Sequence, residues 1–437
     1  AFQILIEAMA QRVAVVGGGV SGSVCASLLR RQGFNVTLFE KSSFLGGRAS
    51  SRKLALKSET GNIQAQHVDV GAHFVKVSDP RFKMLVESPL MQGILQEWPG
   101  RFGVLGGASG AVMSRFDVQS TGMFRQRKAQ ESQEQMSEED SAKQLGEMRS
   151  SAMNFCRFLE GMSDEKLYAC EQNLSEALLQ KASVEVLQDT EVVSATFDPR
   201  RVRWSLAFGG GFAGRHVDDF EALVLANHDP GFAAQVLGDL QSCNVDEELS
   251  RPEVASVVSN FIASLRSLNT TRRCRYSLAI MFPKPLSGLD FDALAVHGSS
   301  EVQFLCRESS KPGRGLGVEV WVAQSTTEFA QMLDREDCEK KVAEKFWQAV
   351  KALLVKSPSL SVPEPLSMQV YSWENAFFQN TLELNAPGET HNDAVTFKPW
   401  ALALCGDYLS SDQCVEEAAL SGLMAANRIA GWAHGAD

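Results

Sequence analysis

A glycine-rich turn between an apolar strand and a helix constrains the fold of this 437-residue chain more than any other feature. Residues 13–16 are all apolar and lead into Gly17-Gly-Gly19-Val-Ser-Gly22, which matches the pattern G-x-G-x-x-G. Residues 21–31 then show helical spacing, Gly33 breaks the helix, and residues 36–39 form a second apolar run. Two buried strands joined by one helix predict a β-α-β unit with a right-handed crossover in a parallel sheet.

The turn also has the chemistry of a dinucleotide site. Gly17 permits the tight turn, Gly19 lets the backbone approach a pyrophosphate, and Gly22 lets the helix and strand pack closely. The helix N-terminus offers free N–H groups and the positive end of its dipole to the phosphates. Glu40 ends the second strand, where a carboxylate can accept hydrogen bonds from a ribose diol. The cofactor contacts predicted here are Gly17, Gly19, Val20, Ser21, Gly22, Glu40 and Lys41.

Two further segments favour a flavin over a nicotinamide cofactor. Gly46-Gly47-Arg48 follows the second strand directly, and Asp69-Val-Gly71-Ala72-His73 comes soon after. The glycine pair would bring the backbone close to the pyrophosphate and ribityl chain, with Arg48 near the phosphate charge or the isoalloxazine. A bare Rossmann dehydrogenase needs no such extension.

The C-terminal part supplies the other half of the predicted flavin site. An apolar run over residues 400–405 ends in Gly406-Asp407, and a helix is expected over 415–430. Asp407 could hold a ribityl hydroxyl, although a simple turn or N-cap residue is the alternative. The helix beginning at Val415 could face the flavin N1/C2 edge, where negative charge appears on reduction.

The remaining sequence predicts a second domain and an insertion. Residues 184–225 read as four strands with a hairpin turn at residues 209–211, and residues 250–370 mix strands with a helix over 336–351. Residues 121–150 read as a solvated surface insertion, and residues 1–8 as the remnant of a leader or an artificial extension.

The predicted fold class is therefore α/β: a Rossmann-like FAD-binding domain of the glutathione-reductase or amine-oxidase type with a second, mixed α+β substrate domain. The FAD-binding domain takes residues 9–76, 168–230 and 396–437. The substrate domain takes residues 77–167 and 231–395.

Composition excludes several other classes. The net charge of −11 argues against nucleic acid as a partner, and no apolar stretch has the length that a membrane span requires. Nine cysteines without a C-x-x-C pair argue against a disulfide scaffold or a zinc site, so we expect no metal. An intracellular, reducing compartment fits best, either the cytoplasm or an organelle after removal of a leader.

These motifs resemble the FAD-dependent amine oxidase (flavin-containing amine oxidoreductase) superfamily and, within it, the renalase-like branch. The resemblance runs from about residue 11 to 429, with residues 100–165 poorly matched. Beyond the segments above, it includes Thr190-Glu-Val192-Val-Ser as the adenine-side strand, Arg275-Tyr-Ser-Leu-Ala-Ile-Met-Phe, and Val415-Glu-Glu-Ala-Ala-Leu-Ser-Gly. It implies that Val192 contacts the cofactor. It also implies non-covalent FAD, because the flavin-cysteine motif of monoamine oxidases is not visible.

The resemblance implies an enzyme that takes a hydride from a small substrate at flavin N5. For the renalase-like branch, the substrates are dihydronicotinamide isomers of the NAD(P)H type, and oxygen is the acceptor. Two alternatives stay open: an amine oxidase or carotenoid-type desaturase, and a structural subunit, with or without flavin, of a larger protein assembly.

Departures from the family pattern bear on the substrate more than on the cofactor. His73 stands where the family usually has glutamine, Asn227-His228-Asp229-Pro230 replaces a proline-rich turn, and residues 170–174 replace a proline-glycine-methionine segment. His73 is the candidate catalytic residue, with a structural hydrogen bond as the alternative. Candidate substrate contacts are aromatic residues that could instead belong to the core: Tyr371, Trp373 and Tyr408.

Overall fold

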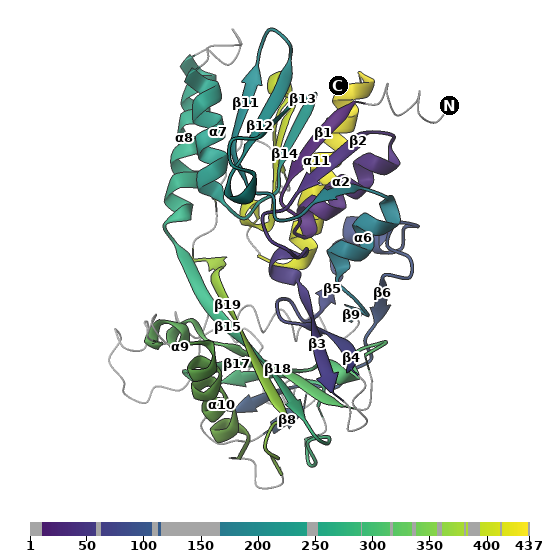
Figure 1. Cartoon of the computed structure of the whole chain (residues 1–437), viewed down its shortest axis with the longest axis vertical. Helices are drawn as coiled ribbons and strands as arrows, with labels where there is room; N and C mark the ends of the chain where they lie inside the picture. Colours follow the sequence, from purple (N-terminus) through teal and green to yellow (C-terminus); the bar gives the residue numbers. More distant parts are fainter. Residues whose placement is uncertain are drawn as a thin grey trace, which may run out of the picture.

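The computed structural model describes residues 11–57, 63–106, 112–114, 167–242, 252–289, 291–314, 318–333, 338–355, 361–379, 382, 394–410 and 413–435. The expected insertion at 121–150 and the N-terminal segment 1–8 lie outside these residues. Figure 1 shows two layered parts, one above the other, with two long strands running between them.

A six-stranded sheet forms the core of the upper part. Its strands are β10 (Glu185–Leu187), β2 (Asn35–Phe39), β1 (Arg12–Val16), β14 (Ala222–Leu225), β21 (Leu402–Cys405) and β20 (Ala394–Phe397), in that order. All neighbours pair in parallel except β20, which runs antiparallel to β21. The predicted parallel β-α-β unit is confirmed.

Both faces of this sheet are covered, which explains why its strands are apolar throughout. On one face, α2 (Val20–Arg31) and α11 (Val415–His434) pack side by side, and α6 (Leu174–Ala182) packs against α2. On the other face lie the antiparallel strands β11 (Val192–Asp198), β12 (Arg203–Phe208) and β13 (His216–Phe220), together with α7 (Pro230–Ser242) and α8 (Pro252–Asn269). Side chains alternate between the two cores along β1.

A seven-stranded sheet forms the core of the lower part. Its order is β19 (Ser367–Phe378), β15 (Arg272–Phe282), β18 (Glu319–Ser325), β17 (Val302–Arg307), β16 (Ala293–His297), β7 (Phe102–Gly106) and β8 (Val112–Ser114). The helices α9 (Thr327–Met332) and α10 (Glu339–Val355) cover one face. The hairpin of β3 (Ser51–Lys57) and β4 (Ile63–Asp69) packs against the other face.

A small three-stranded sheet lies between the two parts. It consists of β5 (Val75–Lys76), β9 (Leu167–Cys170) and β6 (Leu95–Glu97), and α3 (Pro80–Val86) packs beside it against α2 and α11. No helix in the described parts of the chain is long and apolar enough to cross a membrane.

Most predicted elements are present, with three differences. The run expected at 220–225 divides, because β13 ends at Phe220 in the meander and β14 begins at Ala222 in the parallel sheet. The helix expected over 336–351 continues to Val355. Finally, α7 and α8 pack against the cofactor-side sheet, although residues 231–395 were expected in the substrate domain.

Candidate functional site

Three glycines of the first turn have different surroundings. Gly17 has φ of +109°, and a Cβ there would lie 2.8 Å from the backbone of Ala226. A Cβ on Gly22 would lie 2.0 Å from the Gly17 carbonyl oxygen, so only glycine allows this close packing. By contrast, a Cβ on Gly19 would meet nothing within 4 Å. The backbone at Gly19 therefore borders open space, as a close approach to a pyrophosphate requires.

The start of α2 is open to an anion. Gly19 is its N-cap residue and provides no side-chain cap, so the first N–H groups of the helix lack an intrahelical partner. Beside it, Gly46 donates its N–H to the Gly18 carbonyl over 2.8 Å and bridges to Gly19. Glu40 accepts the Gly18 N–H over 2.7 Å, which places its carboxylate at the same turn. Lys41 is exposed beside it.

An ion pair joins the N-terminal motifs to the C-terminal one. Arg48 pairs with Asp407, whose side chain is buried, and also donates to the Ala376 carbonyl over 3.3 Å. A Cβ on Gly71 would lie 1.9 Å from the Arg48 carbonyl oxygen, so the segment after β4 packs directly on Gly47-Arg48. Gly406 has φ of +151° and donates its N–H to Ser421 of α11 over 2.7 Å. Three predicted cofactor motifs thus meet at one place.

Unsatisfied polar atoms lie at the same edge of the sheet. Directly after β14, Asn227 Oδ1 and both ring nitrogens of His228 are buried, and none of them has a hydrogen-bond partner among the described residues. Burial, followed by the charges of Arg48 and Arg272, holds the pKa of His228 well below its usual range. Open space at Gly19, free helix N–H groups and these orphaned atoms fit a large polar cofactor such as FAD at this edge.

Side chains of the seven-stranded sheet hold the segment Asp69–Gly71 by its backbone. Glu308 accepts the Asp69 N–H over 2.8 Å, and Gln324 donates to the Gly71 carbonyl over 2.7 Å. Trp373 Nε1 lies 3.2 Å from the Val70 carbonyl oxygen and 3.0 Å from Ser277 Oγ. We call these three side chains, Glu308, Gln324 and Trp373, the clamp. It ties a predicted flavin-facing segment to the substrate-side sheet.

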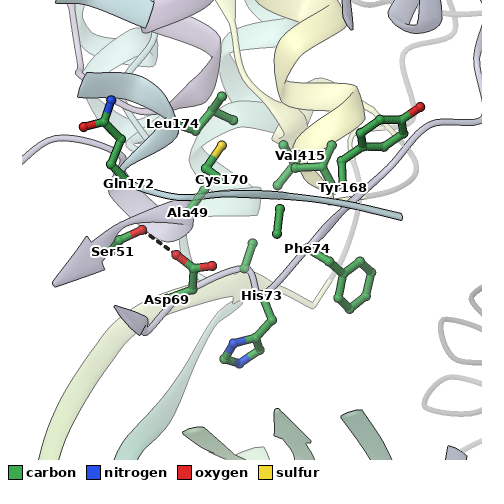
Figure 2. Close-up of a pocket in the computed structure, with 13 residues that line it drawn as sticks. Ala49, Ser51, Asp69, His73, Phe74, Tyr168, Cys170, Gln172, Leu174 and Val415 are labelled. Carbon is green, nitrogen blue, oxygen red and sulfur yellow. Dashed lines mark hydrogen bonds between the residues drawn. The ribbon is translucent and has the colours of Figure 1, made fainter. Parts of the chain in front are cut away.

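A buried group of four charges lies below the clamped segment. Arg314 donates to Asp69 over 2.8 Å, Lys311 donates to the other oxygen of Asp69 over 2.8 Å, and both cations also bind Glu308. All four side chains are at most one-tenth exposed. Ser51 donates to Asp69 as well (Figure 2). Two carboxylates and two cations balance, so the group carries no net charge.

The pKa values follow from this pairing. Burial alone would raise the pKa of Glu308, but the charges of Lys311 and Arg314 hold it well below its usual range. Burial alone would lower the pKa of Lys311, and the charge of Asp69 raises it above its usual value instead. Glu308, Lys311 and Arg314 therefore stay charged near neutral pH.

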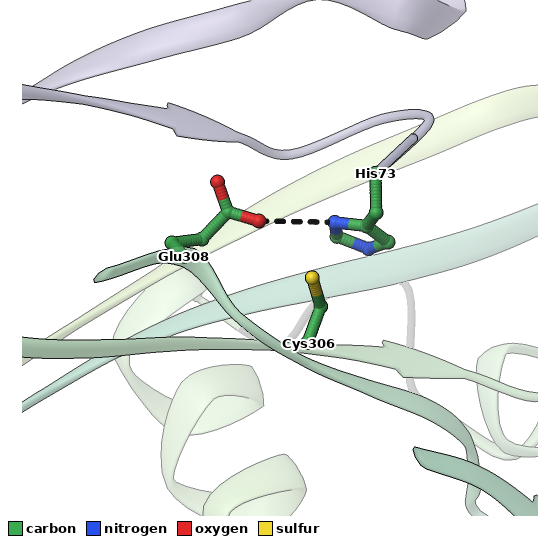
Figure 3. A group of neighbouring side chains, drawn as sticks. All are labelled: His73, Cys306 and Glu308. Carbon is green, nitrogen blue, oxygen red and sulfur yellow. Dashed lines mark hydrogen bonds and ion pairs between the residues drawn. The ribbon is translucent and has the colours of Figure 1, made fainter. Parts of the chain in front are cut away.

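His73 is largely buried. Its side chain is 2% exposed, and the ring stacks on Phe304. Nδ1 lies 3.4 Å from Glu308 Oε1 (Figure 3). Among the residues that the structure describes, Nε2 has no hydrogen-bond partner. Burial lowers the pKa of His73, so the ring is neutral. These surroundings favour the structural alternative over the catalytic role that the sequence suggested.

His73, Cys306 and Glu308 place three potential metal-ligand atoms within 4.8 Å of one another (Figure 3). However, Lys311 and Arg314 already bind Glu308, and a divalent ion would sit beside these two positive charges. Burial also raises the pKa of the Cys306 thiol, which opposes the thiolate that a metal needs. Charge therefore argues against a metal at this position.

A small cavity lies beside the clamped segment (Figure 2). Asp69, Ala72 and His73 line it, together with Ala49, Tyr168, Cys170 and Val415. Val415 begins α11, whose N-cap residue Cys414 provides no side-chain cap. The N-terminus of α11 is thus close to Ala72, as the predicted flavin site requires.

The remaining candidates lie in different surroundings. Tyr371 packs with Trp373 against the β3–β4 hairpin, where burial raises its pKa to about 12. Tyr408 is 2% exposed in the core of the upper part and faces Phe378, so it packs as a core residue. Val192 begins β11 and is also buried in that core.

The sequence reasoning missed the clamp residues Glu308 and Gln324 and the buried cations Lys311 and Arg314. The one available signal was three charged residues at spacings of three, Glu308, Lys311 and Arg314, directly after an apolar strand. Such a pattern on its own predicts a solvated turn, and nothing local indicates a partner in Asp69.

Two protein families match segments of this chain. Residues 15–88 match the NAD(P)-binding Rossmann-like domain, and residues 278–430 match the flavin containing amine oxidoreductase family. The first segment includes the glycine turn, Arg48 and Asp69. The second segment contains all three clamp residues and Asp407. It also contains every member of the four-charge group other than Asp69.

Solved structures share the fold at low sequence identity. A cyclohexylamine oxidase from Brevibacterium oxydans IH-35A has a TM-score of 0.61 and 15% identity, over 97% of this chain and 100% of that one. An oxidoreductase from Methanosarcina mazei has a TM-score of 0.55 and 14% identity, over 94% and 99%. A redesigned putrescine oxidase has a TM-score of 0.55 and 14% identity, over 96% and 98%. The fold class predicted from the sequence is confirmed.

Two alanine substitutions separate cofactor binding from folding. Gly19→Ala adds a methyl group in open space, so the free energy of unfolding without cofactor should change by at most about 1 kcal/mol. FAD should bind at least about tenfold more weakly, because the methyl group obstructs the pyrophosphate. Gly22→Ala should destabilise the fold itself. Thermal unfolding and FAD titration of both variants check this, and unchanged FAD affinity in Gly19→Ala would contradict it.

Removing one cation should lower the free energy of unfolding, because a buried carboxylate then lacks its partner. Arg314→Met leaves two carboxylates with one cation, and the free energy of unfolding should fall by about 3–5 kcal/mol. The double variant Arg314→Met/Glu308→Gln, which restores charge balance, should recover part of that loss. Urea unfolding measures both. A single variant as stable as the unsubstituted protein would show that the pairing contributes nothing.

Proposed function

Because this chain is an FAD-dependent oxidoreductase with the sequence features and fold of the flavin-containing amine oxidoreductase superfamily, we propose that it oxidises a dihydronicotinamide of the NAD(P)H type. In this reaction, the substrate gives up a hydride. This hydride, which carries two electrons, and one proton from solvent together reduce oxygen to hydrogen peroxide. The oxidised substrate is a pyridinium.

The residues for holding FAD without a covalent bond come from both ends of the chain. The turn at Gly17–Gly22 and the start of α2 would take the pyrophosphate, Glu40 the ribose, and Asp407 the ribityl chain. Bound FAD supplies the two-electron acceptor at N5. The protein's tasks are then to orient the substrate, exclude water and stabilise negative charge near the N-terminus of α11.

The clamp is the observation that carries this proposal. Glu308, Gln324 and Trp373 come from the seven-stranded sheet, yet they bind the backbone of Asp69–Gly71 beside the cofactor motifs. This arrangement supports a substrate placed between that sheet and the cofactor, with its donor carbon held over N5.

The burial of the His73 side chain supports a dihydronicotinamide as the substrate. A dihydronicotinamide loses a hydride and becomes an aromatic pyridinium without losing a proton, so the step needs no general base. A protonated amine must first lose a proton. His73, the base that the sequence suggested, is buried against Glu308 and Phe304. The resemblance to the renalase-like branch adds to this support.

The test is the visible absorption spectrum of the purified holoenzyme, followed without oxygen as each dihydronicotinamide isomer is added. We expect the flavin absorbance to bleach within seconds for at least one isomer, and hydrogen peroxide to form when oxygen is admitted. Primary amines, which include cyclohexylamine and putrescine, serve as the comparison. Bleaching by amines alone would favour the amine oxidase alternative. A flavin inert to both classes would overturn the proposal.

A further inference from the structure

Arg275 lies on the face of the lower sheet that looks toward the clamped segment. It precedes Ser277, Ala279 and Met281 at alternate positions of β15, and the latter two pack against Val70 and the β3–β4 hairpin. Leu278, Ile280 and Phe282 point to the opposite face and pack against α9 and α10. Arg275 also pairs in register with the clamp residue Trp373.

Strand β19 lies next to β15 in the sheet and contacts the cofactor motifs along its length. Trp373 contacts the Val70 carbonyl, the Ala376 carbonyl accepts from Arg48, and Phe378 exchanges two hydrogen bonds with Gln413 just before α11. The guanidinium of Arg275 lies over the ring of Phe377, 4.6 Å from its centroid. Arg275 therefore lies beside the stretch of β19 that borders the predicted flavin site. Figure 1 shows β15 and β19 side by side.

The guanidinium of Arg275 has no carboxylate partner. Within the chain as described, it makes no ion pair, and its Nε is buried without a hydrogen bond. By contrast, Arg48 pairs with Asp407, Arg272 with Asp229, and Arg314 with Asp69.

Burial lowers the pKa of Arg275 to about 10, and the exposed Glu328 on α9 offsets this only in part. Arg275 is partly exposed, but its Nε is buried, and desolvating a cation without an anion beside it is costly. An arginine fork suits carboxylate and phosphate groups.

We propose that Arg275 binds an anionic group of the substrate, a carboxylate or a phosphate. The inference rests on the proposed function, because it assigns a substrate contact to the same site. A phosphate would come from a dihydronicotinamide nucleotide, and a carboxylate from an amino acid. An arginine fork can donate two parallel hydrogen bonds to either group, and Nε is one of the donors that lack a partner among the described residues.

The experiment compares three holoenzyme variants. Arg275→Met removes the charge, Arg275→Lys keeps it without the fork, and Arg203→Met removes an equal charge from the β12–β13 hairpin, where Arg203 pairs with Glu221. Each variant is titrated in the oxidised state with inorganic phosphate and with acetate, and the flavin spectrum is recorded. This readout does not require turnover.

We expect one of the two anions to perturb the spectrum of the unsubstituted protein and of Arg203→Met. In Arg275→Met its dissociation constant should rise at least about tenfold, with a smaller rise in Arg275→Lys. Phosphate binding indicates a nucleotide, and acetate binding a carboxylate substrate. The inference would be overturned if Arg275→Met bound both anions as tightly as the unsubstituted protein does. It would also be overturned if the unsubstituted protein bound neither anion.

A second measurement separates this inference from the proposed function. Anaerobic flavin reduction is compared for a dihydronicotinamide mononucleotide and its riboside, which lacks the phosphate. A preference for the mononucleotide that Arg275→Met abolishes supports both. If neither compound reduces the flavin but an anion binds through Arg275, the proposed substrate is wrong and the anion site stands.

Discussion

The buried carboxylate of Asp69 is the interaction on which the rest of the site depends. It ends β4 just before Gly71, and its charge is neutralised by Arg314 and Lys311 from the loop after β17. Burying a carboxylate costs free energy unless a cation is paired with it. If this loop moved away, Asp69 would lose both of its cations, so the pairing holds the loop in place. The same loop supplies Glu308 to the clamp. One electrostatic requirement thus fixes the predicted flavin-facing segment against the substrate-side sheet.

The cofactor site is assembled from distant parts of the chain for a related reason. Parallel strands bring their carboxyl ends to one edge, so Gly17 after β1, Glu40 after β2, Asn227 after β14 and Asp407 after β21 meet there. The ion pair between Arg48 and Asp407 then joins the N-terminal and C-terminal cofactor motifs at this edge. The topology accounts for the predicted dinucleotide site, whereas we propose that substrate choice depends on the face of β15 and β19 that lies toward the clamped segment.

Local patterns were enough to predict the fold around the proposed cofactor site. The predicted roles of Gly17, Gly19 and Gly22 rest on backbone sterics within six residues, and apolar runs mark strands buried on both faces. The substrate half depends on long-range pairing: Asp69 and Arg314 are far apart in sequence, and no local signal joins them. For His73, the residue type suggested proton transfer, whereas the structure buries its ring against Glu308 and Phe304. The helices α7 and α8 lie in the range predicted for the substrate domain but pack against the cofactor-side sheet, because an apolar helix face does not by itself indicate which sheet it covers.

We propose that the glycine turn and the final helix hold FAD between them without a covalent bond. The flavin content of the purified protein before and after acid precipitation tests this directly. We expect one FAD per chain, all of it released into the supernatant. A chain that binds no flavin even when FAD is supplied, or one that keeps its flavin in the precipitate, would contradict it.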